Sequence, residues 1–219
     1  MNISLADMSR YILIITAIIA VLYYKRYKHT SLRYLPYYLW YAVVLEVVAN
    51  ELYIRQMYNV WWYNIGINIE ILFYLYLFYQ YVANRNTKAF ILIGGIIYEA
   101  YFLINYLLLS ASWNTNQTYP FVVGSILVIL VVFLFLIEMF QSDKVLYVGK
   151  YLIFWIGLGL LFYNIIPLPF LIGKTFFSQH GLSRELKLYM FNIQFASNIL
   201  MYFSFIYGFI WSSMTYKSS

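Results

Sequence analysis

The sequence predicts an all-α fold, a polytopic integral membrane bundle of about seven transmembrane helices with the N-terminus outside and the C-terminus inside. Composition is the first reason, because 64% of the 219 residues are hydrophobic, 10% are charged and the mean hydropathy is +0.72. A soluble domain of this length would lack the polar residues needed to cover its core. Apolar runs long enough to cross a bilayer also recur along the whole chain, with charged residues in the short gaps between them. We therefore expect a multi-pass protein of a cell inner or plasma membrane.

The length and pattern of the apolar runs define the predicted helices. A span needs about 20 mostly apolar residues, each rising 1.5 Å. Runs such as Ile12 to Leu22 and Val122 to Ile137 are apolar on every face and lack the in-out alternation of a barrel strand. Because the connections are short, residues 1–219 are predicted to form a single transmembrane domain. The predicted spans lie near 8–25, 34–54, 60–83, 89–110, 119–140, 149–171 and 187–212.

Prolines support three of these boundaries. Pro36 and Pro120 fall in the first turn of the second and fifth spans, where a missing N–H costs nothing. Pro167 and Pro169 fall late in the sixth span and remove hydrogen bonds from carbonyls one turn earlier. The sixth helix is therefore predicted to break near its end.

Basic residues predict the orientation. Counting Lys and Arg in alternate gaps gives nine on one side and five on the other, and the richer side is expected to be cytoplasmic. Near the N-terminus, Lys25, Arg26 and Lys28 follow the first apolar run, the reverse of a secretory signal, so we expect an uncleaved first span. The richer side holds Lys25, Arg26, Lys28, Arg33, Arg85, Lys88, Lys144, Lys150 and Lys217, and the other side holds Arg10, Arg55, Lys174, Arg184 and Lys187.

Composition and motifs exclude several classes of function. The chain has no cysteine, which excludes disulfides, thiolate metal sites and thiol catalysis. Its net charge of +6 is scattered through the gaps between spans, which favours lipid headgroup contact over nucleic-acid binding. His29 and His180 fall in gaps on opposite sides, and no metal-ligand spacing is present, so no metal or cofactor is predicted. Gly157 and Gly159 are interpreted as points of close helix packing rather than a phosphate loop.

Three acidic residues lie at bilayer depth. Glu70 and Glu99 are predicted roughly 13 to 15 Å into their spans, and Glu46 lies past the midpoint toward the outside. We expect no Lys or Arg at comparable depth. Carboxyl groups in a low-dielectric interior should be protonated, or else share water or a bound cation. These residues are therefore candidates for a functional site.

Amide side chains accompany the acids on the same helices. Glu46 and Asn50 share a stripe on the second span with Tyr53, and Gln194 and Asn198 share another on the seventh. One interpretation is a polar cavity open to the outer side. The other is that each group simply bonds a neighbouring helix, at roughly 0.6 to 2 kcal/mol each. The candidate cavity residues are Glu46, Asn50, Asn64, Asn68, Glu70, Glu99, Asn164, Gln194 and Asn198.

One stretch is similar to a known pattern. Residues from Met57 to Glu70, followed by the aromatic run from Ile71 to Tyr79, resemble small heptahelical membrane proteins of the Bacteroidetes type. The resemblance covers about one span and implies no activity.

Two classes of function remain open from the sequence. In the first, a receptor-like or sensor-like module binds a small polar or cationic ligand in the cavity and signals through a membrane or cytoplasmic protein partner. In the second, the same groups line a path for a small solute or ion. An intramembrane enzyme and a purely structural membrane partner are more distant alternatives. The sequence shows no pairing of a nucleophile with a base, which argues against the enzyme. The sequence leaves open whether the protein forms a homo-oligomer.

Overall fold

The computed structural model describes residues 4–109, 115–177 and 184–212, and within these ranges all regular structure is helical. The all-α prediction is therefore confirmed. The long helices are α1 (Leu5–Leu22), α3 (Leu35–Ile54), α4 (Val60–Tyr81), α5 (Arg85–Ile104), α6 (Thr118–Phe140), α7 (Leu152–Ile165) and α9 (Arg184–Trp211). The shorter elements are α2 (Tyr24–Tyr27), η1 (Ser31–Tyr34), the π-helical η2 (Asn105–Leu109), η3 (Asp143–Lys150) and α8 (Leu168–Phe177).

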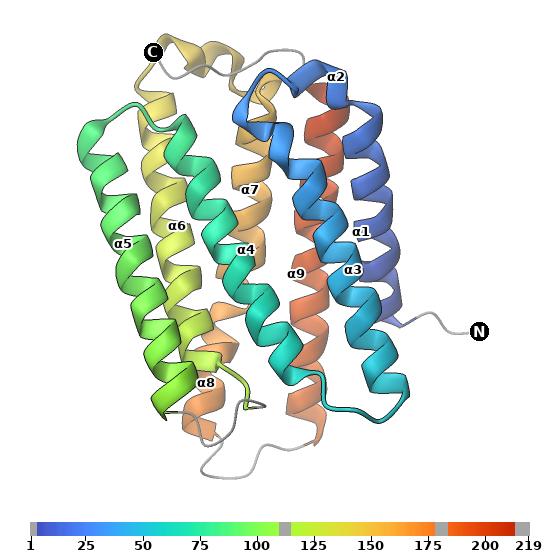
Figure 1. The fold of residues 1–219 in the computed structure, drawn as a ribbon. Coiled ribbons are helices and arrows are strands. Elements are labelled where there is room, and N and C mark those ends of the chain that lie inside the picture. Colours follow the sequence, from blue (N-terminus) through green and yellow to red (C-terminus); the bar gives the residue numbers. More distant parts are fainter. Residues whose placement is uncertain (1–3, 110–114, 178–183, 213–219) are drawn as a thin grey trace.

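The long helices stand side by side and alternate in direction (Figure 1). One end of the bundle, here called the basic end, carries α2, η1, the α4–α5 connection and η3. The other end, here called the N-terminal end, carries the start of α1, the α3–α4 connection and α8. The part of the bundle next to each end is called the basic half and the N-terminal half.

Among the described residues, five helical segments are long and apolar enough to cross a membrane. They are Leu5–Leu22, Arg85–Leu108, Thr118–Phe140, Leu152–Gly173 and Leu188–Trp211. Their length and composition are compatible with a membrane protein. Two other long helices, α3 and α4, are not in this set, and they carry most of the candidate acids and amides.

The predicted effects of proline are confirmed. Pro36 occupies the first turn of α3, and Pro120 that of α6. Helix α7 ends at Ile165, and α8 begins at Leu168, one residue after Pro167. The predicted sixth span is therefore two helices, because proline cannot donate to the carbonyl one turn earlier.

The densest packing lies in the basic half. Helices α7 and α9 make the most extensive contact in the bundle. Gly159 permits this approach, because a Cβ there would lie 2.9 Å from the carbonyl oxygen of Met201. Gly157 faces Val132 and Phe78, so both glycines are packing points as predicted. The fully buried apolar residues of the basic half include Ala20, Leu39, Leu77, Phe78, Phe135, Met139, Ile153, Ile156, Phe205 and Phe209.

Candidate functional site

Glu70 lies midway along α4, near a tyrosine of its own helix and tyrosines of α3, α7 and α9. Its carboxyl group lies near the hydroxyls of Tyr38 on α3, Tyr163 on α7 and Tyr74 one turn further along α4. The Tyr74 hydroxyl also donates to the Tyr38 oxygen at 3.2 Å. Tyr202 on α9 lies within electrostatic range of the same carboxyl group. We call Glu70 and these four tyrosines the Glu70 cluster.

The Glu70 cluster is enclosed by the bundle. Its tyrosines are only 2% to 9% exposed, whereas Glu70 itself is half-buried. A buried hydroxyl needs a hydrogen-bond partner, and a buried carboxyl group needs several. The Tyr74–Tyr38 hydrogen bond meets part of this need, and the gathering of the other hydroxyls around Glu70 places polar groups beside one another in the middle of an apolar bundle.

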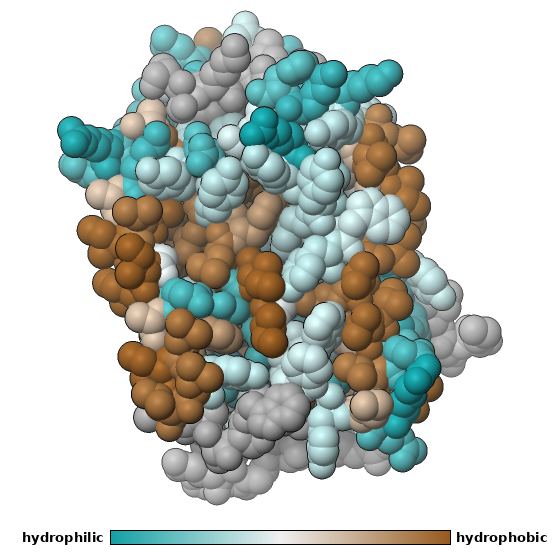
Figure 2. All heavy atoms as spheres, viewed as in Figure 1, coloured by the Kyte–Doolittle hydropathy of each residue, from teal (hydrophilic) through white to brown (hydrophobic). Residues whose placement is uncertain are grey.

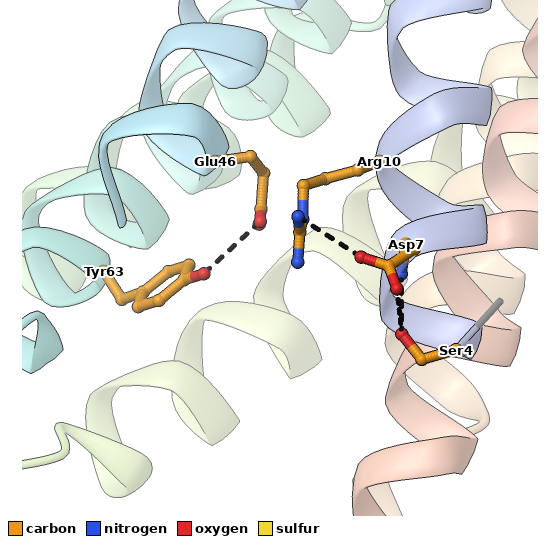
Figure 3. A network of polar contacts seen from close by, with 5 residues as sticks. All are labelled: Ser4, Asp7, Arg10, Glu46 and Tyr63. Carbon is orange, nitrogen blue, oxygen red and sulfur yellow. Dashed lines mark hydrogen bonds and ion pairs between the residues drawn. The ribbon is translucent and has the colours of Figure 1, made fainter. Parts of the chain in front are cut away.

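A second acid lies between the Glu70 cluster and the N-terminal end. Glu46 on α3 accepts a hydrogen bond from the Tyr63 hydroxyl on α4 at 3.3 Å and lies within electrostatic range of both Glu70 and Arg10. Figure 3 shows the Arg10 side chain extending from α1 toward Glu46. Arg10 Nη1 lies 3.4 Å from Asp7 Oδ1.

The expectation that no cation reaches the depth of the acids is therefore wrong for Glu46. Arg10 was assigned to the outer gap because of its place near the start of the first span. Its side chain is long enough to reach inward from the first turns of α1 toward α3.

Polar groups follow one another from the N-terminal end to the middle of the bundle. The Ser4 hydroxyl donates to Asp7 Oδ2 at 2.6 Å, and Asp7 pairs with Arg10. Arg10 faces Glu46, and Glu46 in turn lies near Glu70. Since Asp7 and Arg10 are 43% and 29% exposed, this series leads from the surface to the Glu70 cluster.

Three further candidates form a separate cluster on another face of α4. Asn68 Nδ2 donates to Glu99 Oε2 on α5 at 3.0 Å. Asn64 Nδ2 donates to the Thr115 carbonyl at 2.9 Å, and Asn64 Oδ1 accepts from the Gln117 N–H at 3.2 Å. At 100° per residue, Asn64 and Asn68 lie roughly 120° and roughly 160° around α4 from Glu70. The nine candidates are therefore divided between at least two places.

The remaining candidates join neither cluster through a hydrogen bond among the described residues. Asn164 donates to the Leu160 carbonyl of its own helix at 2.8 Å. Asn50 and Gln194 are half-buried, and Asn198 Oδ1 is buried with no hydrogen-bond partner in the described part of the chain. Tyr53, expected on the same stripe as Glu46, is 73% exposed and faces away from the interior.

Sequence reasoning placed no tyrosine with Glu70 in the candidate cavity. Tyr74 lies four residues after Glu70, and Tyr63 lies seven residues before it. Their place on the same face of α4 as Glu70 can therefore be predicted from the sequence. The contributions of Tyr38, Tyr163 and Tyr202 depend on which helices are neighbours, which spacing within one helix does not reveal.

The chemistry of the site suits a cation. Carboxyl and hydroxyl oxygens can accept hydrogen bonds from an ammonium group, and tyrosine rings attract cations through their faces. Among the described residues, no group of three or more His, Cys, Asp and Glu side chains could hold a metal ion. No protein-family model, curated protein or solved structure matches the chain. The function is therefore argued from the site alone.

Proposed function

We propose that this chain is a seven-helix integral membrane protein that binds a small organic cation at Glu70 and acts as a receptor-like module. The ligand enters from the N-terminal end, which faces the outside. The observation that carries the proposal is the enclosed carboxyl group of Glu70, which lies near tyrosine hydroxyls from α3, α4 and α7. Helices packed around the ligand would transmit its presence to a protein partner.

Length and position support α3 and α4 as two further spans. They contain 20 and 22 residues, long enough for roughly 30 Å of hydrocarbon. Both lie within the antiparallel bundle beside the apolar helices (Figure 1). Their lower hydropathy follows from acids, amides and tyrosines, several of which face other helices rather than lipid. Polar residues in a span normally face a bundle interior.

The charge distribution supports the orientation. The basic end carries Lys25, Arg26, Lys28 and Arg33 close together in sequence, and Arg85 and Lys88 follow at the start of α5. Positive charge is retained on the cytoplasmic side of most membrane proteins. The N-terminal end, where the polar series begins, is then outside.

An asymmetry between the two halves favours a receptor over a permeation path. Toward the N-terminal end, Glu70 is followed by Glu46, Arg10 and Asp7. Toward the basic end, the next layer of α3, α4 and α9 contains Leu39, Leu77 and Phe205, which are fully buried. A cation that reached Glu70 would therefore meet an apolar barrier on the far side.

Ligand-dependent stabilisation tests the proposal. Purified protein is screened with primary amines and quaternary ammonium ions, with uncharged alcohols of matched shape as the negative probes. At least one cation should raise the melting temperature, while its alcohol analogue should not. Glu70→Gln should weaken this binding by about tenfold or more, because it removes the charge partner of the ligand. Glu51→Gln is the matched control, since Glu51 is an exposed acid of α3 paired with Arg55 at 2.8 Å.

Transport is the alternative, and flux separates it from the receptor proposal. Protein reconstituted in liposomes is assayed with the amines that bind and with protons. A receptor should give the same flux as empty vesicles. Flux above that level and abolished by Glu70→Gln would support transport instead. Equal binding by wild type and Glu70→Gln would contradict both functions at this site.

A further inference from the structure

An open groove separates α3 from α4 on the side of the bundle. It has a volume of about 400 Å³ and is lined by Tyr34, Tyr37 and Tyr38 from η1 and α3, and by Ile69, Phe73 and Tyr76 from α4. In Figure 2, side chains of intermediate hydropathy gather over these two helices, between strongly hydrophobic surfaces. We call this feature the aromatic groove. Among successive long helices, α3 and α4 make the least extensive contact.

The aromatic groove runs along the helix axes. Tyr76 and Ile69 lie seven residues apart on α4, a distance of about 10 Å. The Tyr76 ring contacts Tyr34 near the basic end, with 6.1 Å between ring centroids. The groove therefore starts at the basic end and extends toward the middle of the bundle, which is the direction of an acyl chain in a bilayer.

The walls of the groove are almost entirely apolar carbon. Tyr38 stacks on Phe73 with ring centroids 4.4 Å apart and an interplanar angle of 6°. Tyr37, Ile69 and Tyr76 are 68%, 42% and 43% exposed. If α3 and α4 cross the membrane, this surface faces lipid, and an acyl chain can fill it without loss of hydration.

A cationic group stands beside the basic end of the groove. The Arg33 guanidinium carbon lies 4.7 Å from the centroid of the Tyr34 ring, and Nη2 donates to the Tyr34 hydroxyl. Arg33 forms no ion pair with any residue in the described part of the chain. A guanidinium has five N–H donors in a fork that suits phosphate oxygens. Because Arg33 would repel a cation here, this site differs in chemistry from the Glu70 cluster.

We propose that the aromatic groove holds one anionic phospholipid from the leaflet at the basic end. The phosphate binds Arg33, and one acyl chain lies along Phe73 as far as Ile69. Tyr34 positions the guanidinium, since it both stacks beneath it and accepts its hydrogen bond. The site depends on α3 and α4 facing lipid, and it does not depend on ligand binding at Glu70.

Lipid binding by the purified protein tests this inference. Delipidated protein in a neutral detergent is titrated with phosphatidylglycerol or with phosphatidylethanolamine of the same acyl chains, at high salt to screen diffuse attraction. Bound lipid is counted by native mass spectrometry, and affinity is obtained from thermal stabilisation. Phosphatidylglycerol should bind as one retained molecule and with about tenfold higher affinity than phosphatidylethanolamine, because the ammonium group of the latter competes with Arg33 for the phosphate and is repelled by the guanidinium.

Two pairs of variants locate the lipid. Arg33→Gln should remove the preference for phosphatidylglycerol, whereas Lys25→Gln, at an exposed lysine of α2 at the same end, should retain it. Ile69→Trp should fill the groove and displace both lipids, whereas Ile65→Trp, one turn away at a position 38% exposed, should not. Equal losses for Arg33→Gln and Lys25→Gln, or retention of lipid by Ile69→Trp, would overturn the proposal. The helical circular dichroism spectrum and the size-exclusion profile of each variant serve as the check that it is folded.

Discussion

The basic half and the N-terminal half of the bundle use the same long helices but accommodate polar groups differently. In the basic half, buried polar groups donate to backbone carbonyls: Ser204 Oγ to Trp155 at 2.6 Å, and the Tyr27 hydroxyl to Ala20. Around them, side chains such as Phe78 and Phe205 are fully buried. These two polar groups are each satisfied separately within tight apolar packing, which is the character of a packed scaffold.

In the N-terminal half, polar side chains meet one another. The series from Ser4 through Arg10 to Glu46 approaches the Glu70 cluster, and Asn68 bonds Glu99. Oδ1 of Asn68 is buried without a partner among the described residues, as is Oδ1 of Asn198 at the middle of α9. Such groups cost stability, and proteins tolerate them mainly where recognition requires them. The difference between the halves is the reason why the proposed ligand site lies toward the N-terminal end.

The largest expected effect concerns the sides of the membrane on which the two ends lie. Because the chain has no cysteine, single cysteines can be introduced without background. A membrane-impermeant maleimide applied to right-side-out vesicles should label Tyr58→Cys, at the N-terminal end, and should leave Lys28→Cys, at the basic end, unlabelled until the membrane is opened. Labelling of both sites from one side would mean that α3 does not cross. The reverse pattern would invert the orientation but keep the bundle.

Packing in the basic half should be sensitive to truncation. Phe78 is fully buried and contacts Phe135 edge to face, with ring centroids 5.2 Å apart. Phe78→Ala should lower the free energy of unfolding by about 3 kcal/mol, the low end of the usual range, because lipid already solvates apolar groups. Phe203→Ala, at a position 51% exposed on α9, should change it by no more than about 0.5 kcal/mol. Denaturation in mixed micelles measures both, and equal losses would contradict a densely packed basic half.

Two substitutions six residues apart on α9 should change stability in opposite directions. Ser204→Ala removes the hydrogen bond to Trp155 and should cost about 0.6 to 1.7 kcal/mol. Asn198→Leu replaces a buried oxygen that has no hydrogen-bond partner among the described residues and should stabilise the protein by about 1 kcal/mol. The same unfolding assay gives both values. A destabilised Asn198→Leu would show that this amide is satisfied in the folded protein and would weaken the distinction between the halves.

The sequence predicted the helices better than it predicted the site. Apolar runs and Pro36, Pro120 and Pro167 placed the elements, because length, hydropathy and proline act within a single helix. The contact of Tyr163 with Glu70, and the approach of Arg10 to Glu46, join helices far apart in the chain. Spacing along one helix cannot predict such neighbours.

The division of the N-terminal half into two polar clusters should appear as a small but specific coupling energy. Asn68 and Glu99 share a hydrogen bond at 3.0 Å, so Asn68→Ala and Glu99→Ala should be coupled in a double-mutant cycle by about 0.6 to 1.7 kcal/mol. Glu70 and Glu99 lie on different sides of α4. The losses of unfolding free energy caused by Glu70→Ala and Glu99→Ala should therefore add to within about 0.5 kcal/mol. Unfolding free energies of the single and double variants measure both cycles. Strong coupling between Glu70 and Glu99 would join the two clusters into one interior, which would enlarge the binding site beyond the Glu70 cluster.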